Sequence, residues 1–161
     1  MDYPRWAELE TARGVISAET IPFLHLREVA PGLHVGGGAA VTLRGDWRLV
    51  IDFDGLSRDP DNAGAYPRTA VLHALPMEDG NPFPPGNLDR VEALYLEHLG
   101  QGPILFHCAM GASRSASAAY AILRKVTGLE HEEALRRVQI PSLCGYPMKH
   151  TLQSAVRWAT R

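Results

Sequence analysis

The chain alternates short apolar runs with longer segments in which apolar residues recur at helical spacing. The short runs predict four strands, over residues 33–35, 47–53, 70–75 and 103–107. The longer segments predict helices over residues 87–99, 115–126, 130–138 and 147–160, with a further short helix near residues 6–12. Stretches rich in Gly, Pro and Asn predict loops over residues 57–66 and 77–86. Strands interleaved with helices indicate an α/β domain, with a central, mostly parallel sheet flanked by helices on both faces.

Length and composition restrict the class of protein. A chain of 161 residues suffices for one domain with a core, which we place at residues 31–161 after an N-terminal extension at residues 1–30. The net charge of −2 shows no basic excess, so we expect neither nucleic acid nor a membrane as partner. The sequence has no apolar stretch of membrane-spanning length, no secretory signal pattern at its start, and two cysteines. We therefore expect a reduced, cytoplasmic protein.

One segment combines residue types that together indicate chemistry. It begins with His107 and Cys108, ends with Arg114 and Ser115, and has the sequence HCAMGASRS. It follows the apolar strand 103–107 directly and leads into a predicted helix. A cysteine shortly before an arginine is common by chance, but His, Gly and Ser at fixed places around this pair make the pattern specific.

This arrangement suits the binding of a phosphoryl group. Backbone N–H groups of a loop that opens a helix point inward and act together with the positive end of the helix dipole. The loop residues that would supply them are Ala109, Met110, Gly111, Ala112 and Ser113. The planar guanidinium of Arg114 can hold two phosphoryl oxygens at once, which a lysine cannot do. The same field favours the thiolate form of Cys108, so a nucleophile would be available without a metal or other cofactor.

The pattern His-Cys-x5-Arg-Ser resembles the signature loop of the cysteine-based protein tyrosine phosphatases, in the short form typical of dual-specificity phosphatases. Two upstream segments are also similar to that family: PGLHVGGGAA to an early strand and turn, and LPMEDG to the segment that bears the general acid. The resemblance covers residues 31–160. It implies a dual-specificity phosphatase-like fold and a two-step reaction through a phosphocysteine.

The resemblance also implies a role for each matching residue of the loop. Cys108 would attack phosphorus while Arg114 holds the phosphoryl group. The hydroxyl of Ser115 would assist departure of the thiolate in the second step, although this serine also fits an ordinary helix N-terminal cap. His107 would support the geometry of the loop and the thiolate.

The general acid implied by the resemblance is Asp79, in the loop 77–86. It would protonate the leaving oxygen and then help to activate water. Its spacing to Cys108 is slightly short for the family, and two other carboxylates compete for the role. Glu78 is adjacent, and Asp89 is better explained as a charge in the first turn of a helix.

Other interpretations of the sequence are weaker. The segment LVIDFDG resembles the first motif of haloacid-dehalogenase-type phosphatases, which use an aspartyl nucleophile and Mg²⁺, but the usual threonine and late Asp pair are missing. Asp52 and Asp54 therefore fit a turn better. Residues 36–38 also indicate a turn rather than a phosphate loop. Rhodanese sulfurtransferases and arsenate reductases have cysteine–arginine loops but fit the upstream aspartate less well, and a purely phosphate-reading module would lack the nucleophile or the acid.

The substrate class follows from the variable loop positions, which contain no lysine. This disfavours a polyphosphorylated inositol lipid, because its extra phosphates need basic partners. We expect a phosphorylated protein or a small phosphomonoester, with phosphotyrosine preferred over phosphoserine or phosphothreonine. A phosphorylated sugar, nucleotide or RNA end is the alternative. Cys144 is expected to be an ordinary thiol, or a disulfide partner for oxidised Cys108.

Overall fold

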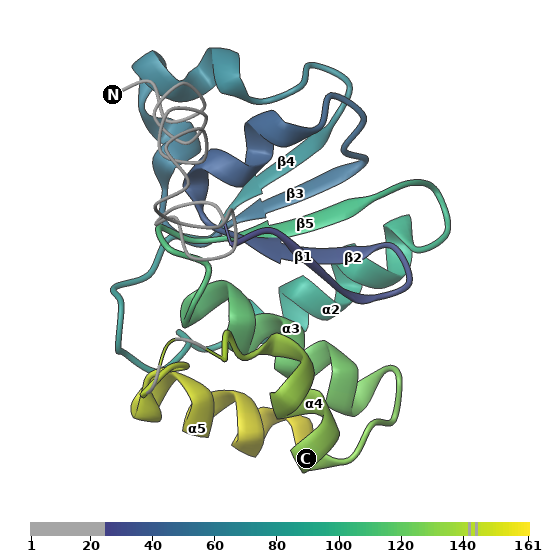
Figure 1. Cartoon of the computed structure of the whole chain (residues 1–161), viewed down its shortest axis with the longest axis vertical. Coiled ribbons are helices and arrows are strands. Elements are labelled where there is room, and N and C mark those ends of the chain that lie inside the picture. The colour runs from purple at the N-terminus through teal and green to yellow at the C-terminus, as the bar shows by residue number, and fades with distance from the viewer. Residues whose placement is uncertain (1–24, 142, 144) are drawn as a thin grey trace.

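The computed structural model describes residues 25–141, 143 and 145–161, so the helix predicted near residues 6–12 and the prediction for Cys144 lie outside it. Five strands form one sheet in the order β1-β2-β5-β3-β4 (Figure 1). Their bounds are β1 (Arg27–Ala30), β2 (Leu33–Gly36), β3 (Leu49–Asp52), β4 (Val71–Ala74) and β5 (Ile104–His107). All neighbouring pairs are parallel except β1 with β2. The predicted mostly parallel sheet is confirmed.

Strand β1 lies within the segment 1–30, which the sequence pattern sets apart from the domain. It forms an antiparallel pair with β2, with Arg27 opposite Val35 and an irregularity between Glu28 and Ala30. The last residues of that segment therefore complete the sheet.

Helices cover both faces of the sheet. Four α-helices gather on one face (Figure 1): α2 (Asn87–His98), α3 (Arg114–Lys125), α4 (His131–Val138) and α5 (Lys149–Ala159). Helix α3 contacts the sheet, and α4 and α5 pack on α3. The other face is covered by short 3₁₀ helices, η1 (Gly38–Leu43), η2 (Leu56–Arg58) and η3 (Pro60–Ala65). Among the described residues, no helix is both long and apolar enough to span a membrane.

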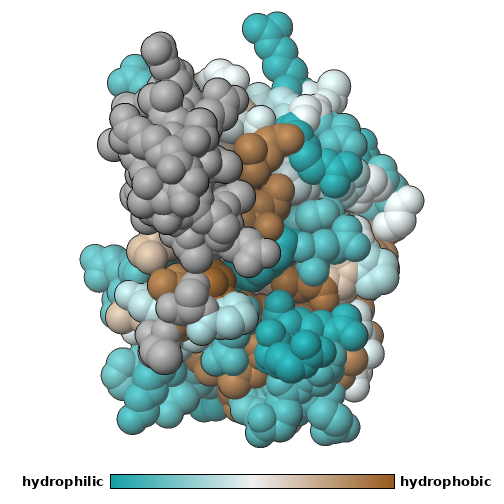
Figure 2. Space-filling model, viewed as in Figure 1, coloured by the Kyte–Doolittle hydropathy of each residue, from teal (hydrophilic) through white to brown (hydrophobic). Residues whose placement is uncertain are grey.

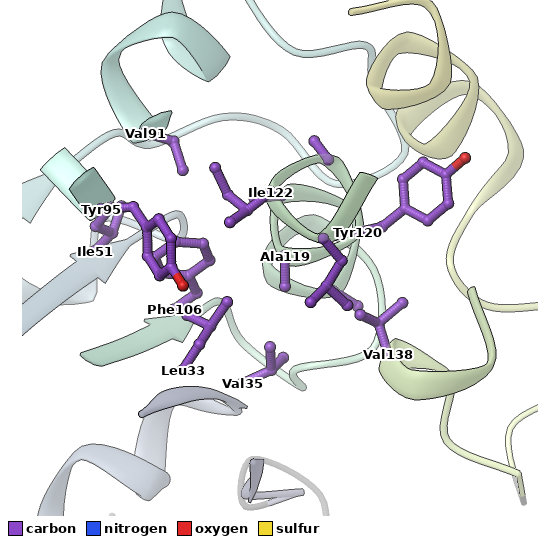
Figure 3. Packing of buried hydrophobic residues seen from close by; sticks show 14 of the residues in the cluster. Leu33, Val35, Ile51, Val91, Tyr95, Phe106, Ala119, Tyr120, Ile122 and Val138 are labelled. Carbon is purple, nitrogen blue, oxygen red and sulfur yellow. The ribbon is translucent and has the colours of Figure 1, made fainter. Parts of the chain in front are cut away.

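The central strands are mostly apolar because both of their faces are buried, and their polar residues, such as Asp52 and His107, are buried with them. Alternate residues of β3 and β5 enter two separate clusters, so that Ile51 and Phe106 face the α-helices while Val50 and Leu105 face Trp47 and the 3₁₀ layer. Figure 3 shows side chains of α2 and α3 meeting those of the strands. The small residues of α3, such as Ala119, let this helix lie close to the sheet.

The polar faces of the helices lie outward. On the view in Figure 2, hydrophilic side chains predominate over the end of the molecule formed by α4 and α5. Exposed large hydrophobic residues among the described part of the chain are few and scattered: Leu43, Leu72, Leu96 and Leu99.

Parallel pairing brings three strand ends to one edge of the sheet. Gly36 of β2 and Asp52 of β3 both lie opposite His107, the last residue of β5. The carboxyl ends of parallel strands are the usual place for a binding site in α/β folds. Cys108 therefore begins its loop at this edge, between two neighbouring strand ends.

Asp52 is completely buried and shapes the turn after β3. Its carboxylate accepts hydrogen bonds from the N–H groups of Asp54, Gly55 and Ser57 and from the Ser57 hydroxyl, at 2.7–2.9 Å. Burial raises the pKa of Asp52, but these donors and neighbouring His107 outweigh burial, and the net pKa lies below its ordinary value. Asp52 therefore serves the turn, as predicted, and its oxygens are not free to attack phosphorus.

We predict that Asp52→Asn destabilises the fold. The amide places an NH₂ group among N–H donors, so the free energy of unfolding at pH 7 should fall by about 1–3 kcal/mol in a urea titration. The pKa of Asp52 is lower in the folded protein than in the unfolded chain. The ionised carboxylate therefore stabilises the fold fully at pH values above the ordinary carboxyl pKa, and this stabilisation is lost as pH falls through the pKa of the folded state. The difference in free energy of unfolding between Asp52→Asn and wild type should therefore become smaller as the pH is lowered.

The matched control is Asp46→Asn. Asp46 is exposed and pairs with Arg44 at 2.9 Å, and such surface pairs add little to stability. Equal effects of the two substitutions would contradict the role assigned to Asp52.

Candidate active site

The 108–113 loop joins β5 to α3 and places Cys108 at the base of a pocket. The cysteine side chain is almost completely buried. The N–H of Gly111 donates to Cys108 Sγ at 3.3 Å, and Ser115 Oγ lies 3.2 Å from the same sulfur. The sulfur thus has two polar groups within hydrogen-bonding distance, one of which is a backbone N–H donor. Ser115 makes this contact rather than capping the helix, because the N-cap residue is Ser113.

Two carbonyl groups of the loop are held from outside the pocket. Cys108 O lies 3.4 Å from His107 Nδ1, and Ala109 O accepts a hydrogen bond of 3.0 Å from the N–H of Gly38. In a trans peptide the C=O and the following N–H point in opposite directions. The N–H groups of Ala109 and Met110 therefore point away from these anchors, toward the pocket that both residues line.

His107 is completely buried, and burial lowers its pKa although Asp52 opposes the shift. The imidazole is therefore neutral near pH 7 and carries one ring proton. The carbonyl of Cys108, which can only accept, lies 3.4 Å from Nδ1, whereas Asp52 Oδ1, also only an acceptor, lies 3.7 Å from Nε2, beyond hydrogen-bonding distance, so we assign the proton to Nδ1. Nε2 then accepts from the hydroxyl of Tyr66 at 2.9 Å. Burial raises the pKa of Tyr66, which keeps this phenol protonated.

Gly111 is required by both conformation and space. Its φ of +76° is unfavourable for other residues, and an added Cβ would lie 2.5 Å from the carbonyl carbon of Gly36. The loop therefore lies directly on the backbone of Gly36 and Gly37. The glycine run after β2 provides room for this contact.

Arg114 is the first residue of α3 and is 6% exposed. Its Nη1 donates to the carbonyl of Met77 at 2.9 Å and to Asp54 Oδ1 at 3.0 Å, with the carbonyl of Phe53 at 3.3 Å. Its Nε is buried without a hydrogen-bond partner. The three contacts on Nη1 fix the plane of the guanidinium, and Nη2 remains available to a ligand.

Asp54 is a site residue that the sequence interpretation missed. The pattern Asp52-x-Asp54-Gly55 assigned both aspartates to a turn, but the structure separates them. Asp52 holds the turn, whereas Asp54 forms an ion pair with Arg114 at 3.0 Å. Nothing local distinguishes the two roles, because Arg114 lies 60 residues further along the chain.

Asp79 lies beside the loop. It lines a cavity of about 50 Å³ together with Cys108, Arg114 and other loop residues, and Tyr146 adds one side. Asp79 Oδ1 is 3.6 Å from Arg114 Nε, and the side chain is half exposed.

The two competing carboxylates lie elsewhere. Glu78 is exposed and accepts from Asn81, and Asp89 accepts from Trp158 Nε1 at 2.9 Å in the first turn of α2. Of the three carboxylates, Asp79 is the one that lines the cavity.

The chain is similar in sequence to a dual specificity protein phosphatase and in fold to solved structures that include DUSP28 and PTPMT1. The mouse (Mus musculus) dual specificity protein phosphatase 12 is 32% identical over 117 residues, which make up 68% of this chain, and the chain spans 34% of that relative. The structure of human DUSP28 has a TM-score of 0.68 at 20% identity and covers 84% of this chain and 93% of its own. PTPMT1 in complex with PI(5)P has a TM-score of 0.63 at 15% identity, with 84% and 94% covered. No family model matches the sequence.

We predict that Asp54→Ala weakens oxyanion binding. The variant removes a charge-assisted acceptor that orients Arg114, so the fork should lose its fixed plane. The affinity for orthovanadate, measured by calorimetry, should decrease by roughly 3- to 10-fold in Asp54→Ala. The affinity of Asp54→Asn should lie between those of Asp54→Ala and wild type.

Asp59→Ala is the matched control, because Asp59 belongs to the same segment but caps η3 instead of contacting Arg114. Unchanged vanadate affinity in Asp54→Ala would show that Arg114 is oriented without this carboxylate.

Proposed function

Because the chain has the fold and the signature loop of the cysteine-based protein tyrosine phosphatase superfamily, in dual-specificity phosphatase-like form, we propose that it hydrolyses phosphate monoesters through a phosphocysteine. The observation that carries the proposal is the convergence on one small cavity of Cys108, the loop N–H groups, Arg114 and Asp79. Each of these groups supplies one requirement of phosphoryl transfer: a nucleophile, a dianion cradle, a charge clamp and a proton donor.

In the first step the thiolate of Cys108 attacks phosphorus and the P–O bond to the leaving group breaks. Asp79, in its acid form, gives its proton to the departing oxygen. Arg114 and the loop N–H groups hold the phosphoryl oxygens. The products of this step are a phosphocysteine, the free alcohol or phenol, and the Asp79 carboxylate.

In the second step water attacks phosphorus and the S–P bond breaks. The Asp79 carboxylate takes a proton from the water, so the acid is restored and inorganic phosphate is released. Negative charge develops on Cys108 Sγ, and the Ser115 hydroxyl at 3.2 Å can donate a hydrogen bond to it. Ser115 therefore acts on the leaving thiolate.

Phosphotyrosine is the proposed preferred substrate, with phosphoserine and phosphothreonine next. Among the described residues that line the cavity, Arg114 is the only cation, so one phosphoryl group has a charged partner and further phosphates have none. This supports a simple phosphomonoester. A non-protein substrate is the second candidate, because PTPMT1, of similar fold, is known in complex with PI(5)P.

Turnover of a substrate panel separates these candidates. We would compare a phosphotyrosine peptide with phosphoserine and phosphothreonine peptides, a phosphoinositide and a 5′-phosphorylated RNA. A kcat/KM highest for the phosphotyrosine peptide supports the proposal, whereas a higher value for the lipid or the RNA would replace it.

We predict that hydrolysis of an aryl phosphate needs Cys108 and no metal ion. Cys108→Ser should abolish turnover, because a serine hydroxyl is not ionised at neutral pH, while orthovanadate should still bind to the intact loop. Wild-type activity in EDTA should equal that in its absence. Full loss of activity in EDTA, combined with an active Cys108→Ser variant, would refute the cysteine mechanism.

We predict that Asp79→Asn lowers kcat by roughly 10²–10⁴ for substrates with poor leaving groups, and much less for good ones, since only a basic leaving oxygen needs a proton. Steady-state kinetics on a series of substituted aryl phosphates measures this dependence. Glu78→Gln and Asp89→Asn are matched controls that should behave like wild type. The assignment would pass to either residue whose substitution produces the leaving-group dependence instead.

A further inference from the structure

Arg27, in β1, lies beneath the 108–113 loop. Its Nη2 donates to the carbonyl of Gly111 at 3.0 Å and to the carbonyl of Val138 at 2.5 Å, and its Nη1 donates to the carbonyl of His25 at 2.7 Å. The Nε of Arg27 is buried without a hydrogen-bond partner. One side chain thus joins the edge of the sheet, the loop and the last residue of α4.

The position of Val138 favours a cation here. Val138 ends α4, and the last carbonyls of a helix lack partners within the helix and lie at the negative end of its dipole. Arg27 therefore meets two requirements with one guanidinium: it supplies a donor to the end of α4 and another to the loop.

The charge of Arg27 persists near neutral pH. Burial lowers the pKa of Arg27 to about 10, and the charge of Cys108 partly opposes this shift. The sulfur of Cys108 therefore lies within electrostatic range of the Arg27 guanidinium.

The peptide between Gly111 and Ala112 depends on an external anchor. Glycine rotates more freely than other residues, so this peptide can turn more easily than its neighbours in the loop. When its carbonyl points to Arg27, the N–H of Ala112 points the opposite way, toward the cavity that Ala112 lines. His107 and Gly38 hold the carbonyls of Cys108 and Ala109 in the same manner.

We propose that Arg27 is a positioning residue of the active site, which fixes the Gly111–Ala112 peptide so that the Ala112 N–H faces the phosphoryl group. The proposal rests on the proposed function, because the loop must bind an oxyanion for this orientation to matter. It adds to the site a residue that lies outside the signature loop and outside the acid loop.

The test compares wild type, Arg27→Lys and Arg27→Met by orthovanadate affinity and by kcat on an aryl phosphate. In Arg27→Met the peptide loses its anchor and the sulfur loses a neighbouring cation, so affinity and kcat should both fall on the order of 10- to 100-fold. Lysine keeps the charge but lacks the second nitrogen that binds the His25 carbonyl and the rigid plane that this bond fixes, so the affinity and kcat of Arg27→Lys should fall between those of the other two proteins.

Arg124→Met is the matched control. Arg124 is also a partly buried arginine that donates to a backbone carbonyl, that of Leu129 at 3.3 Å, but it lies at the far end of α3. The Arg124→Met variant should bind orthovanadate with the affinity of wild type. Urea unfolding of all variants separates stability from binding, since a purely structural arginine would change the unfolding midpoint alone.

The outcomes distinguish the two proposals. A wild-type protein that neither binds vanadate nor hydrolyses aryl phosphates would overturn the proposed function and this inference with it. An active wild type with unchanged vanadate affinity and kcat in Arg27→Met would overturn the inference alone. If Arg27→Met does not fold, Arg27→Lys decides: wild-type affinity and kcat in that variant overturn the inference, and a loss of threefold or more in both supports it.

Discussion

A backbone loop can bind an anion through its N–H groups only when its carbonyl groups are held on the other side, because each peptide carries both and they point in opposite directions. In the 108–113 loop these partners come from three separate parts of the fold. The ring of His107 faces one carbonyl, the N–H of Gly38 binds the next, and Arg27 binds that of Gly111. The sheet edge, with its parallel strand ends, brings these partners to one place.

Residues at the same edge of the sheet also compensate the buried positive charge of Arg114. Arg114 is nearly buried, and a buried cation is stable only with hydrogen-bonding or charged partners. Asp54 and the carbonyls of Phe53 and Met77 supply them on Nη1. His107 adds no charge, because burial keeps it neutral. A phosphoryl dianion entering the cavity would therefore meet a guanidinium that is already oriented, while the neutral ring of His107 lies buried outside the cavity lining.

The sequence predicted those parts of the structure that local patterns encode. Strands β2 to β5 and helices α2 to α5 follow from apolar periodicity, and the loop follows from a motif of consecutive residues. Strand β1 was not predicted, because REVA is too short and too polar to show alternation, and its pairing with β2 decides its conformation. Asp54 and Arg27 were missed for a related reason: their partners lie 60 and 84 residues away in sequence. Such contacts depend on topology, which residue spacing alone does not reveal.

The contacts of Met148 indicate how the acid loop and the 108–113 loop are connected. The N–H of Met148 donates to Ser113 Oγ at 3.0 Å, so the residue before α5 is fixed to the 108–113 loop. Its side chain lies against Gly80, where an added Cβ would approach Met148 Cε to 3.0 Å. Gly80 directly follows Asp79, whose half-exposed carboxylate lies 3.6 Å from Arg114 Nε. Met148 thus contacts both the backbone next to Asp79 and the 108–113 loop. The two segments are therefore joined by packing, so the proton transfer proposed for Asp79 would take place between parts of the fold that are already in contact.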